Sequence, residues 1–320
     1  MFNKVHAIFG IVLAAFGALM IAGSAAAADV GIGQSKPGQL DLQTPVTQVG
    51  RQVMDLHHLM LVIITGITIF VLALLVIVIL RYNNLANKTP ARWTHNSLVE
   101  FVWTAAPVVI LVIIAIPSVR LLQLQEDFDR VKPDLVIKAT GNQWYWTYSY
   151  KGQELEYDGV MIGGGAATLT SDIKEELNDA GYPPEAWKLA TDTAVVVPVN
   201  KTVLVEVTAA DVIHAWAVPS FGVKADGVPG RINRTWFNAE KEGVYFGQCS
   251  ELCGKDHSYM PITVKVVSQG EYDAWLACAK ADGPDGCETP TMFDYMERMK
   301  RQLVAEKEGE KLAALSPEAR

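Results

Sequence analysis

The stretch LMLVIITGITIFVLALLVIVIL occupies residues 59–80 and contains no charged side chain. At 1.5 Å per residue, such a helix is about 33 Å long, which is enough to cross the hydrocarbon core of a bilayer. A second block without charges occupies residues 101–119, between Glu100 and Arg120. Its two prolines are compatible with a membrane helix, which tolerates proline better than a soluble one. The two blocks predict a transmembrane hairpin over residues 59–120, in contact with the lipid bilayer.

The loop between the two blocks, residues 81–100, indicates the orientation of the hairpin. It carries Arg81, Lys88 and Arg92, and no acidic residue before Glu100. Loops rich in Lys and Arg tend to stay on the cytoplasmic side. We therefore expect this loop in the cytoplasm, with the segments before and after the hairpin on the other side of the membrane.

The N-terminus has the features of a secretory signal peptide over residues 1–28. Lys4 precedes an apolar run at residues 8–22, and small residues follow at 24–28. This order of basic, apolar and small residues is typical of a cleavable signal. Cleavage would leave an exported N-terminal segment at residues 29–58, in agreement with the loop charges. An uncleaved anchor helix is the alternative.

Composition narrows the classes of function. The 320 residues are 50% hydrophobic and 19% charged, with a formal net charge of −8. Such a chain is neither disordered nor a purely cytosolic enzyme. Nucleic-acid binding is disfavoured, because it requires clustered Lys and Arg. An acidic surface suits a basic partner.

The region after the hairpin changes to short β-rich runs. Six predicted strands lie at residues 135–139, 144–150, 194–199, 202–208, 234–237 and 262–267, separated by turn residues. Runs of this kind are typical of a sandwich or barrel. We expect an extracytoplasmic antiparallel β-sandwich over residues 121–290, with a surface insertion at 163–188. Residues 291–320 are a C-terminal extension that is compatible with an exposed helix.

The segment CSELCGKDHSYM, residues 249–260, carries the chemistry. With His214 upstream, it supplies two thiols, two imidazoles and a thioether, a set of soft and borderline ligands that selects copper. A single copper would leave one cysteine unused. Cys249 and Cys253 can instead bridge two ions, with His214 and His257 at the ends and Met260 and the Glu251 carbonyl completing the set. The sequence predicts a dinuclear copper site.

Simpler interpretations of these cysteines remain open. Cys249 and Cys253 could form a disulfide, which is common in exported domains. Two cysteines and two histidines could also hold a structural zinc ion, although zinc has no use for Met260. The remaining pair, Cys278 and Cys287, lies in a Pro- and Gly-containing stretch, and we favour a local disulfide there.

Four motifs together carry a resemblance to a known family. They are GNQWYW at residues 141–146, DVIHAWAVPSFGVK at 211–224, PGRINR at 229–234 and CSELCGKDHSYM at 249–260. With the preceding hairpin they make the chain similar to subunit II of a bacterial cytochrome c oxidase, over nearly the whole mature chain. The 249–260 segment alone also resembles nitrous oxide reductase, but the two spans and the aromatic motif are specific to the oxidase subunit.

The resemblance implies a cupredoxin fold that holds the copper A centre outside the bacterial inner membrane. The implied copper ligands are His214, Cys249, Glu251 through its carbonyl, Cys253, His257 and Met260. The Glu251 carboxylate would bind a magnesium ion at the boundary with subunit I, the haem-bearing partner. Oxygen reduction and proton pumping would then belong to that partner and not to this chain.

The same resemblance implies roles for residues outside the copper site. Trp144 would receive the electron from cytochrome c, and Glu100 would mark the entrance of a proton path into subunit I. Asp158, Asp192 and Asp211 match an acidic patch that docks cytochrome c. Ser149 departs from the family, since this position is often acidic, so the patch is expected to be weaker here.

Two functions other than that of a cytochrome c oxidase subunit fit parts of this sequence. A membrane-anchored copper chaperone would bind the metal without turnover. Such a protein needs exposed, exchangeable ligands, and it does not require the aromatic residues that follow Gln143 in this chain. A quinol oxidase subunit II should lack the cysteines. Three further histidines, His57, His58 and His95, have no ligand partners at suitable spacing, so we expect them on surfaces or interfaces.

Overall fold

The computed structural model describes residues 32–128 and 131–315. Contacts divide the chain into two units, of which one ends at Tyr295 and the other contains the residues from Met296 onward. The predicted signal peptide, residues 1–28, lies outside the described residues.

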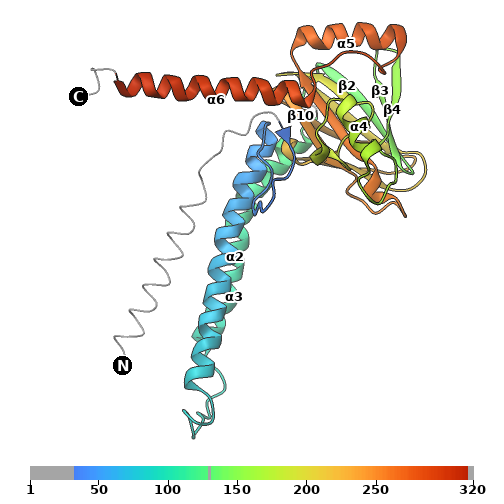
Figure 1. The fold of residues 1–320 in the computed structure, drawn as a ribbon. Coiled ribbons are helices and arrows are strands. Elements are labelled where there is room, and N and C mark those ends of the chain that lie inside the picture. The colour runs from blue at the N-terminus through green and yellow to red at the C-terminus, as the bar shows by residue number, and fades with distance from the viewer. Residues whose placement is uncertain (1–31, 129–130, 316–320) are drawn as a thin grey trace. The chain divides into compact units, whose positions relative to one another are not determined.

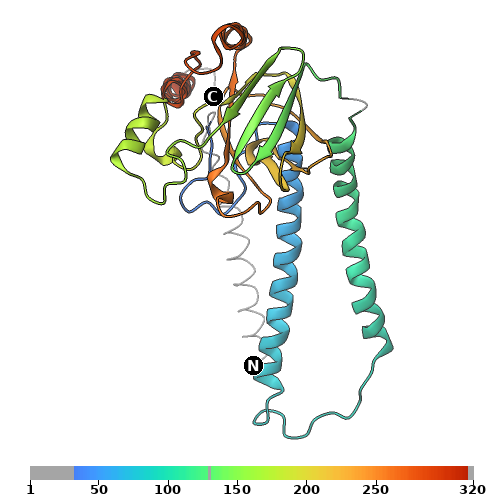
Figure 2. The ribbon, with the colours of Figure 1, turned by 90° about the vertical axis from the view of Figure 1, so that its right-hand side faces the viewer.

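Two long helices form the hairpin (Figure 2). They are α2, Gln48–Arg81, and α3, Ser97–Glu126, so each helix extends the apolar block at both ends. Thr47 and Asn96 cap the two N-termini, because their side-chain oxygens accept hydrogen bonds from first-turn amides. The most apolar window of each helix has no buried residue. Such surfaces are stable when they face lipid.

The β domain contains a five-stranded sheet, a four-stranded sheet and a two-stranded sheet. Figure 1 labels β2, β3, β4 and β10 among their strands. The five-stranded sheet has the order β4-β3-β2-β6-β9, the four-stranded sheet β1-β10-β11-β5, and the small sheet pairs β7 with β8. The strands are β1 Ile32–Gly33, β2 Leu135–Asn142, β3 Tyr145–Tyr150, β4 Leu155–Gly159, β5 Val195–Pro198, β6 Thr202–Ala209, β7 His214–Val218, β8 Val223–Gly227, β9 Asn233–Asn238, β10 Gly243–Gln248 and β11 Pro261–Val267.

The expectation of an antiparallel sandwich is wrong for three strand pairs. β2 pairs with β6, β11 with β5, and β1 with β10 in parallel. Parallel neighbours need a long connection, and β2 and β6 are joined through β3, β4, the insertion and β5. The sequence did not predict β1, β4, β7, β8 and β10. The first four of these have only two to five residues, and β7 and β10 are buried on both faces, so they lack a period-two pattern.

The core lies between the sheets. Buried residues alternate with partly exposed ones along all of β2, and β11 is buried throughout. The largest fully buried side chains include Trp146, Trp216 and Phe237. Each buried large apolar side chain contributes about 1.5–3 kcal/mol to the free energy of unfolding. This rigid core is the scaffold from which the loops project.

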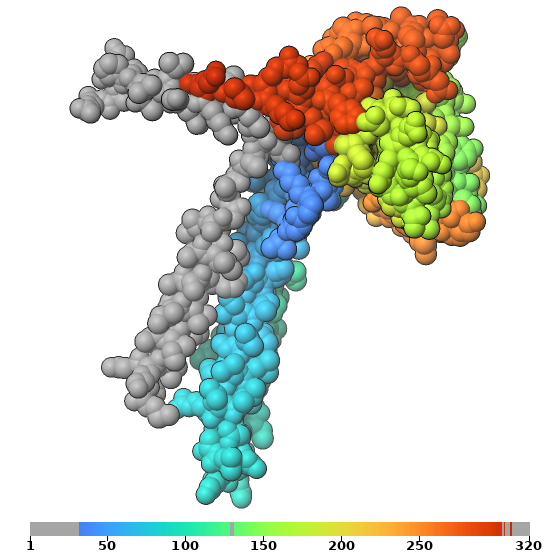
Figure 3. Space-filling model, in the orientation of Figure 1, coloured from blue at the N-terminus to red at the C-terminus, as the bar shows by residue number. Residues whose placement is uncertain are grey.

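The insertion and the C-terminal part add helices to the domain. The insertion contains α4, Ser171–Asp179, and the short helix η1, Pro184–Ala186, and Figure 3 shows its side chains on the surface of the domain. After β11 comes α5, Gln269–Asp282, which the sequence analysis missed. The disulfide between Cys278 and Cys287 is confirmed, with an S–S distance of 2.02 Å. The predicted C-terminal helix is α6, Met292–Leu315.

Hydrogen bonds join both hairpin helices to the β domain. The Thr47 hydroxyl donates to the Phe221 carbonyl oxygen at 2.7 Å, in the short helix η2, Pro219–Phe221. Arg51 forms two 2.7 Å bonds with Glu240. At the end of α3, the Trp236 indole N–H donates to the Leu124 carbonyl oxygen at 3.2 Å. The β domain is therefore tied to the N-terminal end of α2 and the C-terminal end of α3.

Candidate metal centre

The candidate ligands lie where three buried strands begin or end. His214 is the first residue of β7, and the ligand loop, residues 249–260, connects β10 to β11. The two strands pair from Gly243–Val266 to Gln248–Pro261, so the loop leaves and re-enters the sheet at paired positions. A Cβ on Gly247 would lie 2.0 Å from the Ala217 carbonyl oxygen. Only glycine allows β10 to approach β7 so closely, and this brings the loop next to His214.

The donor atoms of the loop form a chain. The Cys249 Sγ lies 3.8 Å from His214 Nδ1 and 4.0 Å from Cys253 Sγ. The Cys253 Sγ lies 3.5 Å from both His257 Nδ1 and Met260 Sδ. His257 belongs to the short helix η3, His257–Tyr259. Each sulfur therefore has one imidazole of its own.

Glu251 contributes its backbone to the same cluster. The Cys249 thiol contacts the Glu251 carbonyl oxygen at 3.4 Å, whereas the Glu251 side chain is exposed. The structure thus brings together all six residues predicted as copper ligands.

The two cysteines are free thiols in a buried setting. Cys249 and Cys253 are 6% and 3% exposed, and His214 and Met260 are buried as well. Their 4.0 Å separation is about twice the S–S distance of about 2.05 Å in a disulfide. In the structure these thiols are therefore not bonded to each other.

The electrostatics of the metal-free cluster are asymmetric. Burial opposes a charge on His214, but its bonds to Cys249 and Asp211 outweigh this and raise the pKa of His214. The pKa of Cys249 is lowered in spite of burial, because of its bond to His214. Burial and the adjacent Cys249 raise the pKa of Cys253 to about 12. Two thiolates at this distance need added positive charge, which a bound cation supplies.

The donor set fits soft metal ions better than one tetrahedral zinc ion. Donor atoms that all lie within 4.8 Å of one another come from His214, Cys249 and Cys253, and His257 is outside this group. A single Cys2His2 ion would need all four donors around one point. Thiolates, imidazoles and a thioether are compatible with copper.

Asp211 holds the imidazole of His214. Its Oδ1 lies 2.8 Å from His214 Nε2, and its Oδ2 accepts a 2.7 Å bond from the Gln143 amide N–H. A proton on Nε2 leaves the lone pair of Nδ1 directed at the thiol cluster. From the sequence, Asp211 was expected only to dock cytochrome c, and Gln143 was only part of the GNQWYW motif.

Trp144 adjoins the ligand loop. Its indole N–H donates to the Cys253 carbonyl oxygen at 3.3 Å, and its ring is half-buried. The Lys255 ammonium lies 5.9 Å from the ring centroid. The proposed electron-entry residue is therefore in direct contact with a residue of the thiol cluster.

The other predicted residues lie apart from the thiols. Asp158, in β4, accepts a 2.6 Å bond from the Thr147 hydroxyl. Asp192 accepts bonds from the amides of Val160 and Thr193, and burial raises its pKa. Glu100 lies in the first turn of α3.

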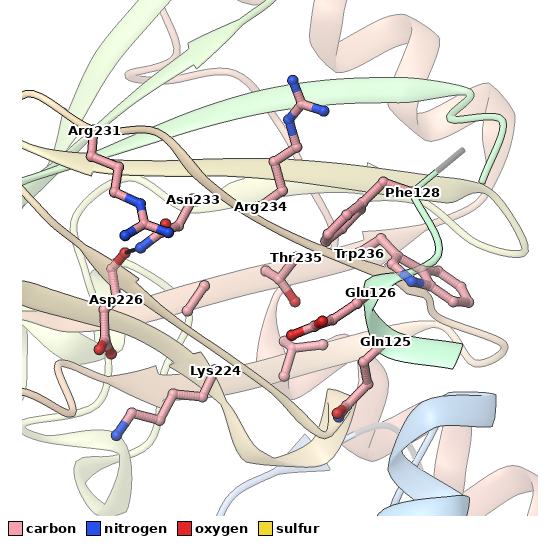
Figure 4. Close-up of a pocket in the computed structure, with 12 residues that line it drawn as sticks. Gln125, Glu126, Phe128, Lys224, Asp226, Arg231, Asn233, Arg234, Thr235 and Trp236 are labelled. Atoms are coloured by element: carbon pink, nitrogen blue, oxygen red, sulfur yellow. Dashed lines mark hydrogen bonds between the residues drawn. The ribbon is translucent and has the colours of Figure 1, made fainter. Parts of the chain in front are cut away.

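A pocket of about 530 Å³ lies between the end of α3 and the strands β8 and β9. Figure 4 shows Arg231 and Asn233 beside Asp226 at one end, and Phe128 beside Trp236 at the other. No predicted copper ligand lines it.

Comparisons with known proteins agree with this architecture. The family model described as the cytochrome c oxidase subunit II periplasmic domain matches residues 135–267, and that of its transmembrane domain matches residues 35–121. Cytochrome c oxidase subunit 2 of Cereibacter sphaeroides is 49% identical over 253 residues, which are 78% of this chain and 83% of the relative. The Arabidopsis thaliana subunit 2 is 40% identical over 249 residues, 76% of this chain and 90% of the relative.

Among solved structures, the periplasmic domain of cytochrome oxidase subunit II from Bradyrhizobium japonicum is 47% identical. The match covers 48% of this chain and 98% of that domain, with a TM-score of 0.40. The expected fold class, a two-helix membrane hairpin followed by a cupredoxin-like β-sandwich, is confirmed. The chain therefore belongs to the cytochrome c oxidase subunit II family, the membrane-anchored subunits of an oxidase complex.

Proposed function

We propose that this chain is the electron-entry subunit of its oxidase and that the thiol cluster holds the dinuclear copper A centre. The observation that carries this proposal is the pair of buried, unbonded sulfurs 4.0 Å apart, each with its own imidazole. When bound, the copper pair would accept an electron from cytochrome c and release it to the haem of subunit I. The six ligand residues are His214, Cys249, Glu251 through its carbonyl, Cys253, His257 and Met260.

The protein's own part in this reaction is to position the ligands and exclude water. The buried sulfur of Cys249 and Nδ1 of His214 face each other at 3.8 Å before any metal arrives. A fixed set of ligands changes little when an electron is added, which favours rapid transfer. Burial also argues against a copper chaperone, whose ligands must be accessible to exchange their metal with a partner.

Electron entry is assigned to Trp144. Its N–H bond to the Cys253 carbonyl oxygen connects the ring to a copper ligand through one hydrogen bond. We place the landing site of cytochrome c around this ring, with Asp158, Asp192 and Asp211 as its acidic groups. Opposite charges chiefly raise association rates. The side chain of Asp158 accepts a bond from Thr147, whereas Asp192 and Asp211 accept two or more bonds each, so we place Asp158 as the most available of the three.

The exposed carboxylate of Glu251 is assigned to a magnesium ion shared with subunit I. Magnesium prefers oxygen ligands and takes few carboxylates from one chain. Glu100 is assigned to the entrance of a proton path into the same partner.

We place the hairpin in the bacterial inner membrane. The loop after Arg81 would then be cytoplasmic, and the N-terminus and the β domain would lie on the periplasmic side. The basic side chains of that loop support this orientation. We also propose that residues 1–28 are removed as a signal peptide, and that the β domain spans residues 121–290.

The test is the metal content of the full-length chain, purified without its partner subunits and loaded with copper. We expect two copper ions per chain and an electron spin resonance spectrum in which one unpaired electron is shared by both nuclei. A His257→Ala variant should lose the shared signal, while His95→Ala, in the loop between α2 and α3, should retain it. One copper or one zinc ion per wild-type chain would contradict the proposal.

A further inference from the structure

The turn between β2 and β3 contacts both halves of the metal centre through one residue. The Gln143 backbone N–H donates to Asp211 Oδ2 at 2.7 Å. Its side-chain amide donates to the Cys253 carbonyl oxygen at 2.8 Å. Gln143 therefore connects the segment that carries His214 to the middle of the ligand loop.

The turn is fitted closely to the His214 half. The second oxygen of Asp211 lies 2.8 Å from His214 Nε2. A Cβ on Gly141, two residues before Gln143, would lie 2.7 Å from His214 Cγ. The imidazole thus packs on the backbone of β2 at a position where a side chain would displace it.

The turn is fitted equally closely to the Cys253 half. Trp144 donates a second hydrogen bond to the Cys253 carbonyl oxygen, at 3.3 Å. Gly254 has a φ of +123°, and a Cβ there would lie 3.1 Å from Gln143 Nε2 and 3.2 Å from Trp144 Cζ2. The loop backbone is thus shaped to admit both side chains.

We propose that Gln143 is a positioning residue that keeps the ligand loop in register with His214 and so holds the two sulfurs at their metal-binding separation. The loop begins where the Ser250 amide bonds to the Ala215 carbonyl oxygen, and it ends where Met260 accepts a bond from Trp146. Cys253 lies between these points, and its carbonyl bond to Gln143 ties that part of the loop to the rest of the domain. The role in metal binding rests on the proposed function.

The position of Cys253 determines whether the two sulfurs stay 4.0 Å apart or move together until they can form a disulfide. Without the Gln143 donor, the Cys253 carbonyl keeps only the longer bond from Trp144. The loop should then reach conformations in which the sulfurs meet. Loss of one hydrogen bond changes such an equilibrium about fivefold.

The test measures disulfide formation in the metal-free, full-length chain with oxidised glutathione as the oxidant. In the reaction the two thiols lose two protons and two electrons, one S–S bond forms between Cys249 and Cys253, and the glutathione disulfide is cleaved to two glutathione molecules. These are the free cysteines of the described chain. Gln143→Met has a similar length but no donor, and we expect it to form the disulfide about fivefold faster than the wild type.

The matched control is Gln269→Met, which removes an exposed side chain of α5 that bonds only to its own helix neighbour Asp273. Its rate should equal that of the wild type. A Gln143→Met rate no higher than this control overturns the inference. A higher rate accompanied by a lower unfolding temperature of the whole domain also overturns it, because Gln143 would then be a general structural residue.

A second measurement uses the copper-loaded chain. We expect the spin resonance spectrum of Gln143→Met to show a changed copper hyperfine splitting at an unchanged copper content, whereas an unchanged splitting would oppose the inference. The thiol experiment contains no copper, so its outcome is independent of the copper stoichiometry. A chain that binds zinc would overturn the proposed function and leave the thiol result as a measure of loop register.

Discussion

The two cysteine pairs of this domain differ in chemistry although both are close in sequence. Cys278 and Cys287 are nine residues apart and form a disulfide. Cys249 and Cys253 are four residues apart and remain free thiols, with their sulfurs separated by 4.0 Å. Proximity in sequence therefore does not determine which pair bonds. The surrounding contacts do, because the ligand loop is tied to Gln143 and Trp144, whereas the other pair links α5 to the segment that follows it.

The two pairs also differ in their effect on the free energy of the folded domain. A disulfide stabilises the fold by restricting the unfolded chain. The free pair places two sulfurs in one buried site. Burial and the adjacent Cys249 raise the pKa of Cys253 there, so a second thiolate is unfavourable in the absence of a cation. The first pair therefore serves the fold, and we propose that the second serves to bind metal.

The largest effect is expected for Cys253→Ser. A serine hydroxyl does not ionise near neutral pH, so the chain would lose one of two bridging ligands. Copper content of the full-length chain should fall to one ion or fewer, and electron transfer from cytochrome c in the assembled oxidase should fall by at least about 100-fold. Metal analysis and stopped-flow kinetics measure the two quantities.

The control for this prediction is the double variant Cys278→Ser with Cys287→Ser. It removes two sulfurs from the domain, one more than Cys253→Ser does, but it should retain the full copper content. If both substitutions reduced copper binding equally, the distinction between the two pairs would be wrong.

The second prediction concerns the stability of the same double variant, Cys278→Ser with Cys287→Ser. A loop of this length gives a disulfide contribution of about 2.5 kcal/mol, and its loss should lower the unfolding temperature of the β domain by about 5–10 °C. Calorimetry on the copper-loaded full-length chain measures this shift. A shift of the same size in Cys253→Ser without any metal bound would show that the free pair, too, is mainly structural.

The candidate ligands could be predicted from the sequence because most of them lie close together along the chain. Cys249, Cys253, His257 and Met260 fall within one loop, and each residue type is a recognisable copper ligand. The two apolar blocks could also be predicted, because a membrane span depends on the composition of a short stretch of sequence.

The sequence could not predict what depends on distant contacts. The parallel pairing of β2 with β6 depends on a connection more than fifty residues long that folds back on the sheet. The state of Cys249 and Cys253 depends on Gln143, which is more than one hundred residues away in sequence. Asp211 is three residues from His214, and its hydrogen bond was missed because the carboxylate was assigned to the surface. The spacing of an acid and a histidine in a loop does not determine whether they face each other.

The third and smallest effect concerns the free pair without metal, and it is expected for Asp211→Asn. Two negative neighbours, Cys249 and Asp211, raise the pKa of His214 against the effect of burial. The amide removes one of these charges but retains an oxygen that can accept the bond from Nε2. We therefore expect the pKa of His214 to fall toward its ordinary value of 6.5, which a nuclear magnetic resonance titration of the metal-free chain measures.

The sign of the accompanying stability change follows from linkage. A base with a raised pKa stabilises the folded state fully below its unfolded-state pKa, here near 6.5, and this contribution is lost as pH rises through the raised value. In the metal-free wild type the contribution of His214 to stability should therefore be lost over that window, against the opposite contribution of the lowered pKa of Cys249, and the His214 loss should be smaller in Asp211→Asn. Asp158→Asn, which removes an exposed carboxylate from β4, should behave as the wild type. Copper competes with a proton for His214 Nδ1, so the same dependence should disappear in the loaded chain. If it persisted there, His214 would not be a ligand, and the contrast between the two cysteine pairs would have to be explained without a metal.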